Sequence, residues 1–237
     1  MFDWIAFDAD DTLWKNEEYY LQGRDLFFNI LEKYDIEDVD LDLVDKLEVK
    51  NLQYYGYGAM SFVLSLIELA IRLTQNQIQA KDIQKILDHG KEMLSVDVEV
   101  FPGVQNLLET LAVKHRLMLI TKGDLFHQQR KFSGSGLTQY FQSVEVVSEK
   151  NLEIYQEIMD RHQVNPGEFL MIGNSLRSDI IPILDLGARA IHLKGHLTWS
   201  HEDDHLKEFP EDRFVEVERI DLVFPAIEKF FGQGKGK

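Results

Sequence analysis

The sequence predicts an α/β protein: a Rossmann-like parallel sheet core with helices on both faces, plus an inserted all-helical cap. Two observations support this prediction. From about residue 98 onward, short apolar runs alternate with segments of helical periodicity, which is typical of a parallel sheet covered by helices. Between about residues 15 and 97, apolar residues recur at helical spacing without a strand pattern. We therefore expect a catalytic core of residues 1–14 and 98–237 and a helical cap domain of residues 15–97.

The individual elements follow from the same patterns. The chain opens with the apolar run Trp4-Ile5-Ala6-Phe7, which predicts a buried strand that ends in acidic residues. Helices of the insertion are expected around residues 26–34, 43–52, 60–73 and 83–94. Phe101-Pro102-Gly103 then interrupts the chain. Beyond it we expect strands at residues 117–120, 144–147, 169–172 and 190–193, with helices at 107–111, from about 126, at 154–162 and at 180–186.

The composition limits the class of partner. An apolar content of 44% in 237 residues is that of a globular protein. The 25 basic and 41 acidic residues give a formal net charge of −16, which repels phosphate backbones and anionic lipid surfaces. We therefore expect a small-molecule ligand, and neither a nucleic-acid polymer nor a membrane. The sequence contains no cysteine, which excludes disulfides and thiol chemistry.

No segment predicts export or membrane insertion. The start, Met-Phe-Asp-Trp, lacks a basic flank followed by an apolar run. The most apolar stretch, Phe62 to Ile71, is short and contains Glu68, so it predicts a core helix. The glycine-rich end from Gly232 to Lys237 is expected to fray. We expect a cytoplasmic protein that is a monomer or a homodimer.

Acidic residues follow the first expected strand directly. The segment Phe7-Asp8-Ala9-Asp10-Asp11-Thr12-Leu13 places three carboxylates within four residues. Such a cluster repels itself unless a cation lies among the acids, and Mg²⁺ prefers oxygen ligands. Because alternate residues of an extended chain point the same way, Asp8 and Asp10 can share one site. An acidic turn or a helix cap explains the segment equally well when it is taken alone.

Three later segments stand at the ends of other expected strands, where the sites of α/β proteins form. Thr121-Lys122-Gly123-Asp124 offers a hydroxyl, a backbone N–H and a helix start, which together suit a phosphate. Lys150 offers a cation, and Gly173-Asn174 through Asp179 offer oxygen ligands. Taken singly, an ordinary strand-to-helix turn, a surface lysine and a helix cap explain them.

In combination the four segments resemble the haloacid dehalogenase superfamily. Their order is strand-Asp-x-Asp-x-Thr, strand-Thr, Lys, and strand-Gly-Asn-Ser-x-x-Ser-Asp, and the resemblance covers nearly the whole chain. The helical insertion resembles the α-helical cap of the first type in that superfamily. The resemblance implies a Mg²⁺-dependent phosphomonoesterase of the phosphatase branch that acts on a small phosphorylated metabolite.

The resemblance also implies a role for each residue. Asp8 would attack phosphorus and form an aspartyl-phosphate. Asp10 would protonate the leaving oxygen and later deprotonate the hydrolytic water. Thr121 and Lys150 would hold the transferring group. Contacts to the phosphate or the substrate are also expected from Thr12, Lys122, Gly123 and Tyr57, and the Mg²⁺ ligands would be Asp8, the backbone carbonyl of Asp10, Asn174 and Asp179.

Two residues depart from the usual pattern of the superfamily. Asp11 stands where many members have glycine. Asn174 stands where an aspartate is usual, and this change removes one charge from the expected metal shell. We expect Asp179 to provide the anionic part of that shell and Asn174 a neutral ligand or a hydrogen bond to a metal-bound water.

Two further features have ordinary explanations as well as functional ones. A second, zinc-like cluster is weakly suggested by His196, His201, His205, Asp203 and Asp204, but the segment has the composition of a solvated loop. Three tyrosines lie around Gly56 and Gly58, namely Tyr54, Tyr55 and Tyr57. They are either core aromatics or, together with Met60, the substrate-facing part of the cap.

Other functions remain open at this point. A nucleotide-specific 5'-monophosphatase fits the first acidic segment, and a phosphomutase would use the same residues. A haloacid dehalogenase displaces halide and needs no acid at position 10, so Asp10 argues against it. The intact pair Asp8 and Asp10 argues against a catalytically silent binding module.

Overall fold

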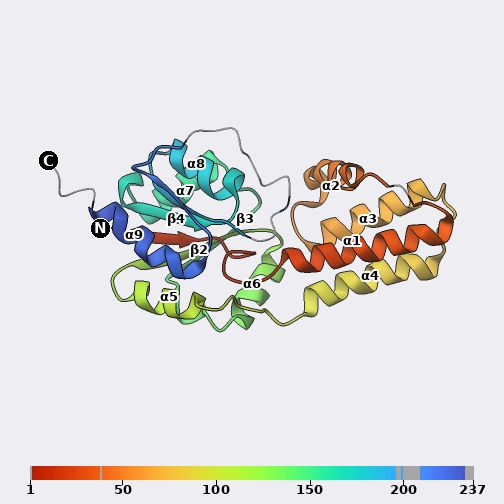
Figure 1. Cartoon of the computed structure of the whole chain (residues 1–237), viewed down its shortest axis with the longest axis horizontal. Coiled ribbons are helices and arrows are strands. Elements are labelled where there is room, and N and C mark those ends of the chain that lie inside the picture. The colour runs from red at the N-terminus through yellow and green to blue at the C-terminus, as the bar shows by residue number, and fades with distance from the viewer. Residues whose placement is uncertain (1, 38, 196–198, 200–208, 233–237) are drawn as a thin grey trace. The chain divides into compact units, whose positions relative to one another are not determined.

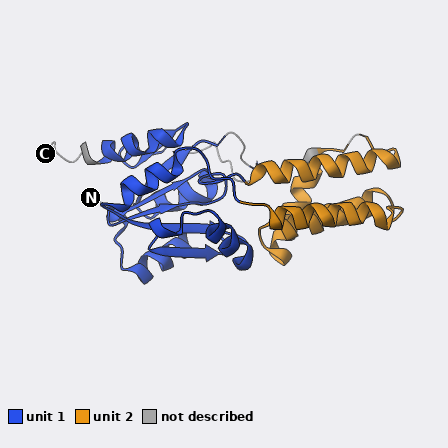
Figure 2. Cartoon of the chain, turned by 90° about the horizontal axis from the view of Figure 1, so that it is seen from below, with its two compact units in different colours: residues 1–15, 98–237 blue, residues 16–97 orange. Residues whose placement is uncertain are grey.

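The computed structural model describes residues 2–37, 39–195, 199 and 209–232. The chain divides into two compact units (Figure 2). Unit 1 comprises Met1–Lys15 and Val98–Lys237, and unit 2 comprises Asn16–Asp97. Unit 2 is therefore an insertion into unit 1. Within the described ranges, no helix is both long enough and apolar enough to cross a membrane.

Unit 1 is built on one parallel sheet of six strands in the order β3-β2-β1-β4-β5-β6 (Figure 1). Every neighbouring pair of strands is parallel. The first strand lies in the middle, so the residues after it stand between those that follow β2 and β4. The strands are β1 Trp4–Phe7, β2 Arg116–Lys122, β3 Ser143–Val147, β4 Phe169–Gly173, β5 Arg189–Leu193 and β6 Phe214–Val217.

Helices cover both faces of this sheet (Figure 1). Alternate residues of β1 face opposite ways, so that Ile5 and Phe7 enter one apolar core while Trp4 and Ala6 enter the other. Helices α5 (Val104–Ala112) and α9 (Val223–Gly232) complete the first core, and α7 (Leu152–His162) and α8 (Ile181–Asp185) complete the second. Helix α6 (Leu125–Gly134) follows β2.

The two segments that join unit 1 to the insertion pair with each other. Trp14 forms an antiparallel bridge with Val100. The Lys15 N–H donates to the Glu99 carbonyl at 3.0 Å, and the Phe101 N–H donates to the Leu13 carbonyl at 2.9 Å. We call residues 13–15 and 99–101 the connecting ribbon.

Unit 2 is a set of four helices with an apolar core of its own. The helices are α1 Glu17–Leu31, α2 Leu41–Tyr55, α3 Ala59–Leu73 and α4 Ala80–Ser95. Phe27, Phe62 and Ile86 are buried in this core. Gly23 permits close packing of α1, because a Cβ at that position would lie 2.6 Å from the Phe62 ring and 2.8 Å from His89 Nε2.

A buried polar cluster lies between α1, α2 and α3. Arg24 Nη2 lies 2.9 Å from Asp45 Oδ1 and 3.4 Å from Glu48 Oε2. Burial raises the pKa of Glu48 to about 7, although the Arg24 guanidinium opposes the shift. Asn51 Nδ2 donates to Ser65 Oγ at 3.0 Å. Unit 2 therefore carries an acid whose charge is poorly stabilised in the folded state.

The predicted fold class is confirmed, and the five expected strands are present. The sixth strand, Phe214–Val217, was not predicted. It is an edge strand with one fully buried residue, Val217, and it contains Glu216, so its sequence lacks the apolar run of a central strand. The histidine-rich segment and the glycine-rich tail lie largely outside the described residues.

Candidate active site

The site is assembled at the carboxyl ends of the central strands. Asp8 directly follows β1, and its N–H donates to the Ile172 carbonyl of β4 at 2.9 Å. Its carboxylate receives the ammonium of Lys150 on Oδ1. The same ammonium lies 2.7 Å from Asp179 Oδ1. All three side chains are buried, so one cation serves two acids away from solvent.

The charges in this triad are unequally stabilised. Burial raises the pKa of Asp8 to about 7, with a further contribution from Asp179, and the Lys150 ammonium only partly opposes it. The pKa of Lys150 is also raised, because the two carboxylates outweigh its own burial. A second cation beside Asp8 would therefore favour the ionised form that a nucleophile requires.

The second oxygen of Asp179 holds the turn after β4. Asp179 Oδ2 accepts a hydrogen bond from the Ser175 N–H at 3.0 Å. This arrangement requires glycine at position 173, because a Cβ there would lie 2.2 Å from Asp179 Oδ2. Whether Asp179 also binds Mg²⁺, directly or through a water, stays a prediction, since its oxygens already contact Lys150 and Ser175.

Two oxygens and one amide atom of Asn174 converge where a cation is expected. One amide atom of Asn174 lies 3.2 Å from Asp8 Oδ2 and 3.3 Å from the backbone carbonyl of Asp10. If that atom is the oxygen, it faces other acceptors only, which is unfavourable without a cation between them. Turned over, the amide nitrogen donates to both groups instead. Oxygens spaced in this way fit adjacent corners of a Mg²⁺ octahedron, since a metal–oxygen distance of about 2.1 Å gives an edge of about 3 Å.

This donor set is therefore suited to Mg²⁺. Among the residues that the structure describes, no three His, Cys, Asp or Glu side chains gather as a ligand set. The proposed site thus depends on one carboxylate, one backbone carbonyl and one amide oxygen, and all of these are hard ligands.

The turn after β1 explains one departure from the superfamily pattern. Asp11 has a φ of 59°, in the left-handed region that glycine adopts freely and that aspartate tolerates better than most residues. The neighbouring Thr12 is fully buried, with its hydroxyl 3.0 Å from Asp8 Oδ2 and 3.1 Å from the Asn174 amide. Its contact with a substrate phosphate stays a prediction.

Asp10 is held by three donors. Trp14 Nε1 and Lys131 Nζ each lie 2.6 Å from Asp10 Oδ1, and Gln128 Nε2 lies 2.9 Å from Asp10 Oδ2. Burial opposes ionisation of Asp10, but the Lys131 ammonium and these hydrogen bonds outweigh it and lower the pKa. The carboxylate is thus fixed in place without contacting Lys150 or Asp179.

The carboxyl end of β2 contributes the expected threonine. Thr121 is buried, and its hydroxyl lies 3.0 Å from Gln128 Nε2. The Gly123 N–H, expected to be accessible, donates instead to the Val147 carbonyl at 3.3 Å, because β2 continues to pair with β3. Lys122 Nζ donates to Ser178 Oγ at 2.8 Å. The structure thus brings Lys122 to the turn that follows β4.

The remaining predicted residues belong to unit 2. Tyr57 lies between α2 and α3, and Tyr54, Tyr55 and Met60 are exposed. Their expected role in substrate contact stays a prediction.

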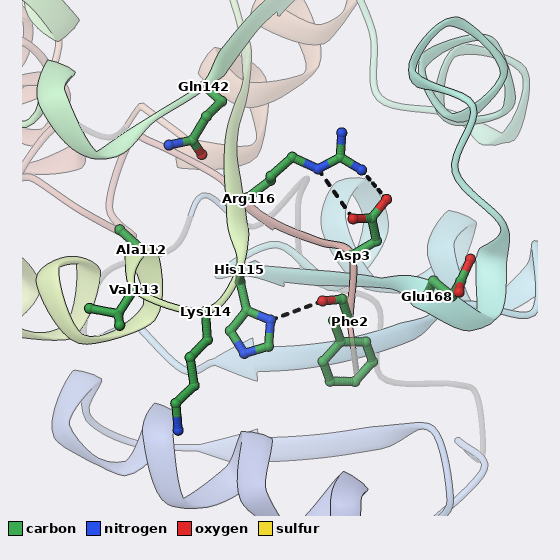
Figure 3. Close-up of a pocket in the computed structure, with 9 residues that line it drawn as sticks. All are labelled: Phe2, Asp3, Ala112, Val113, Lys114, His115, Arg116, Gln142 and Glu168. Carbon is green, nitrogen blue, oxygen red and sulfur yellow. Dashed lines mark hydrogen bonds and ion pairs between the residues drawn. The ribbon is translucent and has the colours of Figure 1, made fainter.

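A pocket lies elsewhere in unit 1, at the amino ends of β1 and β2 (Figure 3). It measures about 530 Å³ and is lined by Asp3, His115 and Arg116 among others. The Arg116 guanidinium bonds to the Asp3 carboxylate, and His115 Nδ1 lies 2.9 Å from the Phe2 carbonyl (Figure 3). None of the predicted site residues lines this pocket.

Four residues near the site were missed by sequence reasoning. Gln128 and Lys131 are three apart on α6, so they share one helix face, but such a polar pair also fits a solvated surface. Trp14 is a large aromatic residue of the kind usually found in an apolar core, so the sequence gives no sign of its contact with Asp10. His192 Nε2 lies 3.1 Å from the Asn174 carbonyl and its Nδ1 lies 2.9 Å from Glu216 Oε2. The latter contact depends on the strand β6 that was not predicted.

Comparison with known proteins gives consistent matches. Residues 2–187 match the model of the haloacid dehalogenase-like hydrolases. The N-acylneuraminate-9-phosphatase of Rattus norvegicus is 32% identical over 200 residues, covering 78% of this chain and 79% of that protein. The pyrimidine 5'-nucleotidase YjjG of Escherichia coli is 26% identical over 210 residues, covering 82% of this chain and 87% of the relative.

A solved structure is similar over nearly the full length. It is a haloacid dehalogenase-like family hydrolase from Xanthomonas campestris, 37% identical, with a TM-score of 0.85. The match covers 98% of this chain and 93% of the other. The similarity thus extends across both units of the chain.

Proposed function

Because this chain belongs to the haloacid dehalogenase-like hydrolases, whose model matches residues 2–187, we propose that it is a Mg²⁺-dependent phosphomonoesterase that works through an aspartyl-phosphate. The family and the curated phosphatase relatives make it a hydrolase of phosphatase type. The observation that best supports the finer proposal is the pairing of buried Asp8 with Lys150, close to a separately held Asp10.

In the first half-reaction Asp8 is the nucleophile. One carboxylate oxygen forms a bond to phosphorus, the bond from phosphorus to the leaving oxygen breaks, and Asp10 delivers a proton to that oxygen. Lys150 and Thr121 hold the transferring group, whose charge lies on its peripheral oxygens. The substrate phosphate brings negative charge near Asp10, which opposes the effect of Lys131 and favours the protonated acid.

In the second half-reaction water attacks the phosphorus of the aspartyl-phosphate. Asp10, now a carboxylate, accepts the proton of that water while the bond between phosphorus and Asp8 breaks. The products are inorganic phosphate and the regenerated Asp8 carboxylate. Trp14 and Lys131 both donate to Oδ1 of Asp10, which holds this carboxylate in place.

Asp8, the Asp10 carbonyl and the Asn174 amide oxygen would hold Mg²⁺. The bound ion offsets the charge between carboxylate and phosphate. Asp179 is proposed to complete the shell through its charge, directly or across a water, while it orients Lys150.

The substrate class is proposed to be small phosphorylated metabolites. Relatives carry the names of a phosphatase of N-acylneuraminate 9-phosphate, a pyrimidine 5'-nucleotidase and a glyceraldehyde 3-phosphate phosphatase. We propose that unit 2, which contains Tyr54, Tyr55, Tyr57 and Met60, selects among such substrates, since the residues proposed to react all belong to unit 1. A nucleoside 5'-monophosphate and a sugar phosphate both fit this proposal.

A substrate panel tests the proposal. The intact protein is incubated with N-acylneuraminate 9-phosphate, pyrimidine 5'-monophosphates, triose phosphates and an aryl phosphate, with and without Mg²⁺. We expect phosphate release that requires Mg²⁺. Halide release from 2-haloacids, with no phosphate release from any ester, would instead identify a dehalogenase.

A further inference from the structure

The Asp10 carboxylate is held asymmetrically. Its Oδ1 accepts from two donors on different segments, Trp14 in the connecting ribbon and Lys131 in α6, each at 2.6 Å. Its Oδ2 receives Gln128 Nε2 at 2.9 Å. One oxygen is therefore anchored by an ammonium and an indole, and the other faces a single neutral amide.

That amide is shared among more acceptors than it has hydrogens. Gln128 Nε2 lies 2.9 Å from Asp10 Oδ2, 3.0 Å from Thr121 Oγ1 and 2.6 Å from the Lys122 carbonyl. An amide nitrogen carries two hydrogens, so it satisfies two of these three acceptors at a time. Gln128 can thus release Asp10 Oδ2 and keep both of its hydrogens bonded.

The other end of the Gln128 side chain has no comparable contact. Gln128 is buried, and its Oε1 has no hydrogen-bond partner among the described residues. Because an unpaired buried carbonyl costs free energy, packing alone does not explain a glutamine at this position. The contacts of Gln128 Nε2 with Asp10 and Thr121 account for a glutamine at this position.

The backbone fixes this arrangement. Helix α6 begins directly after β2, with Asp124 as its N-cap accepting from the His127 N–H at 2.8 Å. A Cβ at Gly123 would lie 3.2 Å from Gln128 Nε2, so glycine gives the amide room. Gln128 and Lys131 project from one face of this short helix toward the same carboxylate.

We propose that Lys131 and Gln128 are positioning residues for proton transfer by Asp10. Lys131 and Trp14 anchor Oδ1, so Oδ2 is the oxygen that exchanges the proton with the leaving group and later with water. Gln128 aligns Oδ2 beside Thr121, the residue proposed to hold the phosphoryl group. The inference rests on the proposed phosphatase function and adds two residues that act through Asp10.

Leaving groups that differ in their need for a proton test this role. Phenyl phosphate and 2,4-dinitrophenyl phosphate are both aryl esters. The phenolate of the first is a poor leaving group and needs a proton as it leaves, whereas 2,4-dinitrophenolate leaves without one. Because kcat/KM reports the steps up to the first irreversible one, it follows transfer to Asp8 for both esters. The ratio of the two kcat/KM values does not depend on the fraction of folded enzyme.

The variants are Gln128→Met and Lys131→Met, with Gln129→Met and Arg130→Met as matched controls at exposed positions of α6. We expect Gln128→Met and Lys131→Met to lower kcat/KM for phenyl phosphate by about tenfold or more, within the range of general acid catalysis. The value for 2,4-dinitrophenyl phosphate should change by less than about threefold, as should both values in the controls. Lys131→Arg, which keeps the positive charge, should retain most of the wild-type kcat/KM for phenyl phosphate.

Two results would overturn this inference and leave the proposed phosphatase function standing. One is an equal fall for both esters in Gln128→Met and Lys131→Met, which marks a merely structural role. The other is no change in kcat/KM for either ester in these two variants, while Asp10→Asn still loses activity selectively toward phenyl phosphate. If Asp10→Asn also lacks this selectivity, or if the wild-type protein releases phosphate from neither ester, the proposed function itself fails.

Discussion

Asp8, the proposed nucleophile, has two properties that oppose each other. It is removed from water, which raises its pKa to about 7, and it must be ionised to attack. The Lys150 ammonium is shared with Asp179, so it does not fully compensate Asp8. A divalent cation bound there would stabilise the Asp8 carboxylate further, and the neighbouring Asn174 amide and Asp10 carbonyl are spaced to supply other ligands.

Replacing either acid of the first segment should separate their roles. Asp8→Asn should abolish turnover, because an amide is a poor nucleophile. Asp10→Asn should slow both formation and hydrolysis of the aspartyl-phosphate, because an amide cannot shuttle a proton. Rapid-quench detection of phosphoprotein measures both steps. Substantial turnover by purified Asp8→Asn protein would end the covalent hypothesis.

The Mg²⁺ concentration that activity requires should change when residues of the turn after β4 are replaced. Asp179→Asn should raise the Mg²⁺ concentration for half-maximal rate by about tenfold or more, as is usual when residues around a metal are lost. Asn174→Asp should lower it by adding a charged oxygen. Titration of the rate against Mg²⁺ measures both.

Asp179 also contacts Lys150, so its replacement needs a control. Lys150→Met, which removes the ammonium and keeps the Asp179 carboxylate, is that control, with Mg²⁺ binding measured directly because Lys150 is also proposed to hold the transferring group. An unchanged Mg²⁺ requirement in Asp179→Asn would leave Asn174 as the contribution of this turn to the metal.

The sequence predicted where the proposed site residues lie along the strands, but not which of them contact one another. Five of the proposed site residues follow strands of one sheet, namely Asp8, Asp10, Lys150, Asn174 and Asp179, and Thr121 lies near the carboxyl end of β2. Strand ends can be found from apolar runs. Pairwise contacts cannot be found in this way, because Lys150 meets Asp179 only through the packing of the strands and their turns. The same limit hid Gln128 and Lys131, whose helix face looks solvated until the tertiary fold brings Asp10 to it.

At the scale of elements, the helices of unit 2 contain a group that resists ionisation. Glu48 in α2 has a pKa raised to about 7 in the folded state from an ordinary 4.5. The folded chain thus holds a proton that the unfolded chain releases as the pH rises above that ordinary value. This group contributes stability that is complete below its ordinary pKa and is lost as the pH rises through about 7.

Glu48→Gln should remove this pH dependence. Between about pH 5 and pH 8, the free energy of unfolding of the variant should fall less than that of the wild type, by about 1–3 kcal/mol. Urea unfolding at a series of pH values measures the difference. The exposed Glu37→Gln, in the same unit, serves as the control. Identical pH profiles for wild type and Glu48→Gln would show that Glu48 is not the source of the effect.

Strands with continuous apolar runs were predictable, and the edge strand β6 was not. Strands β1, β2 and β4 lie inside the sheet and have continuous apolar runs, which need no tertiary information to detect. Strand β6 has one neighbour, β5, and has polar or half-exposed residues at most positions. Its pairing with β5 stabilises a sequence that has little strand character of its own.

At the scale of the whole molecule, the separate core of unit 2 predicts partial independence in unfolding. Phe62→Ala in α3 should cost about 3–5 kcal/mol, as is usual for a buried phenylalanine. Hydrogen exchange of the native protein should then speed up in α1–α4 and change little in the sheet of unit 1. Leu170→Ala in β4 should give the opposite pattern. Equal acceleration in both units by either variant would show that the chain unfolds as one cooperative body.

The connecting ribbon has a consequence for how such a protein can change over generations. Its two segments are held together by their own hydrogen bonds, so a sequence inserted between Lys15 and Val98 meets attachment points that are already side by side. The entropy of joining those ends grows slowly with the length of the insert. Gene rearrangements that exchange the insert therefore leave β1, β2 and β4 intact. Trp14, which belongs to the ribbon and donates to Asp10, would have to be retained. A lineage with this architecture can thus exchange the inserted unit in one event and keep the residues of unit 1 unchanged.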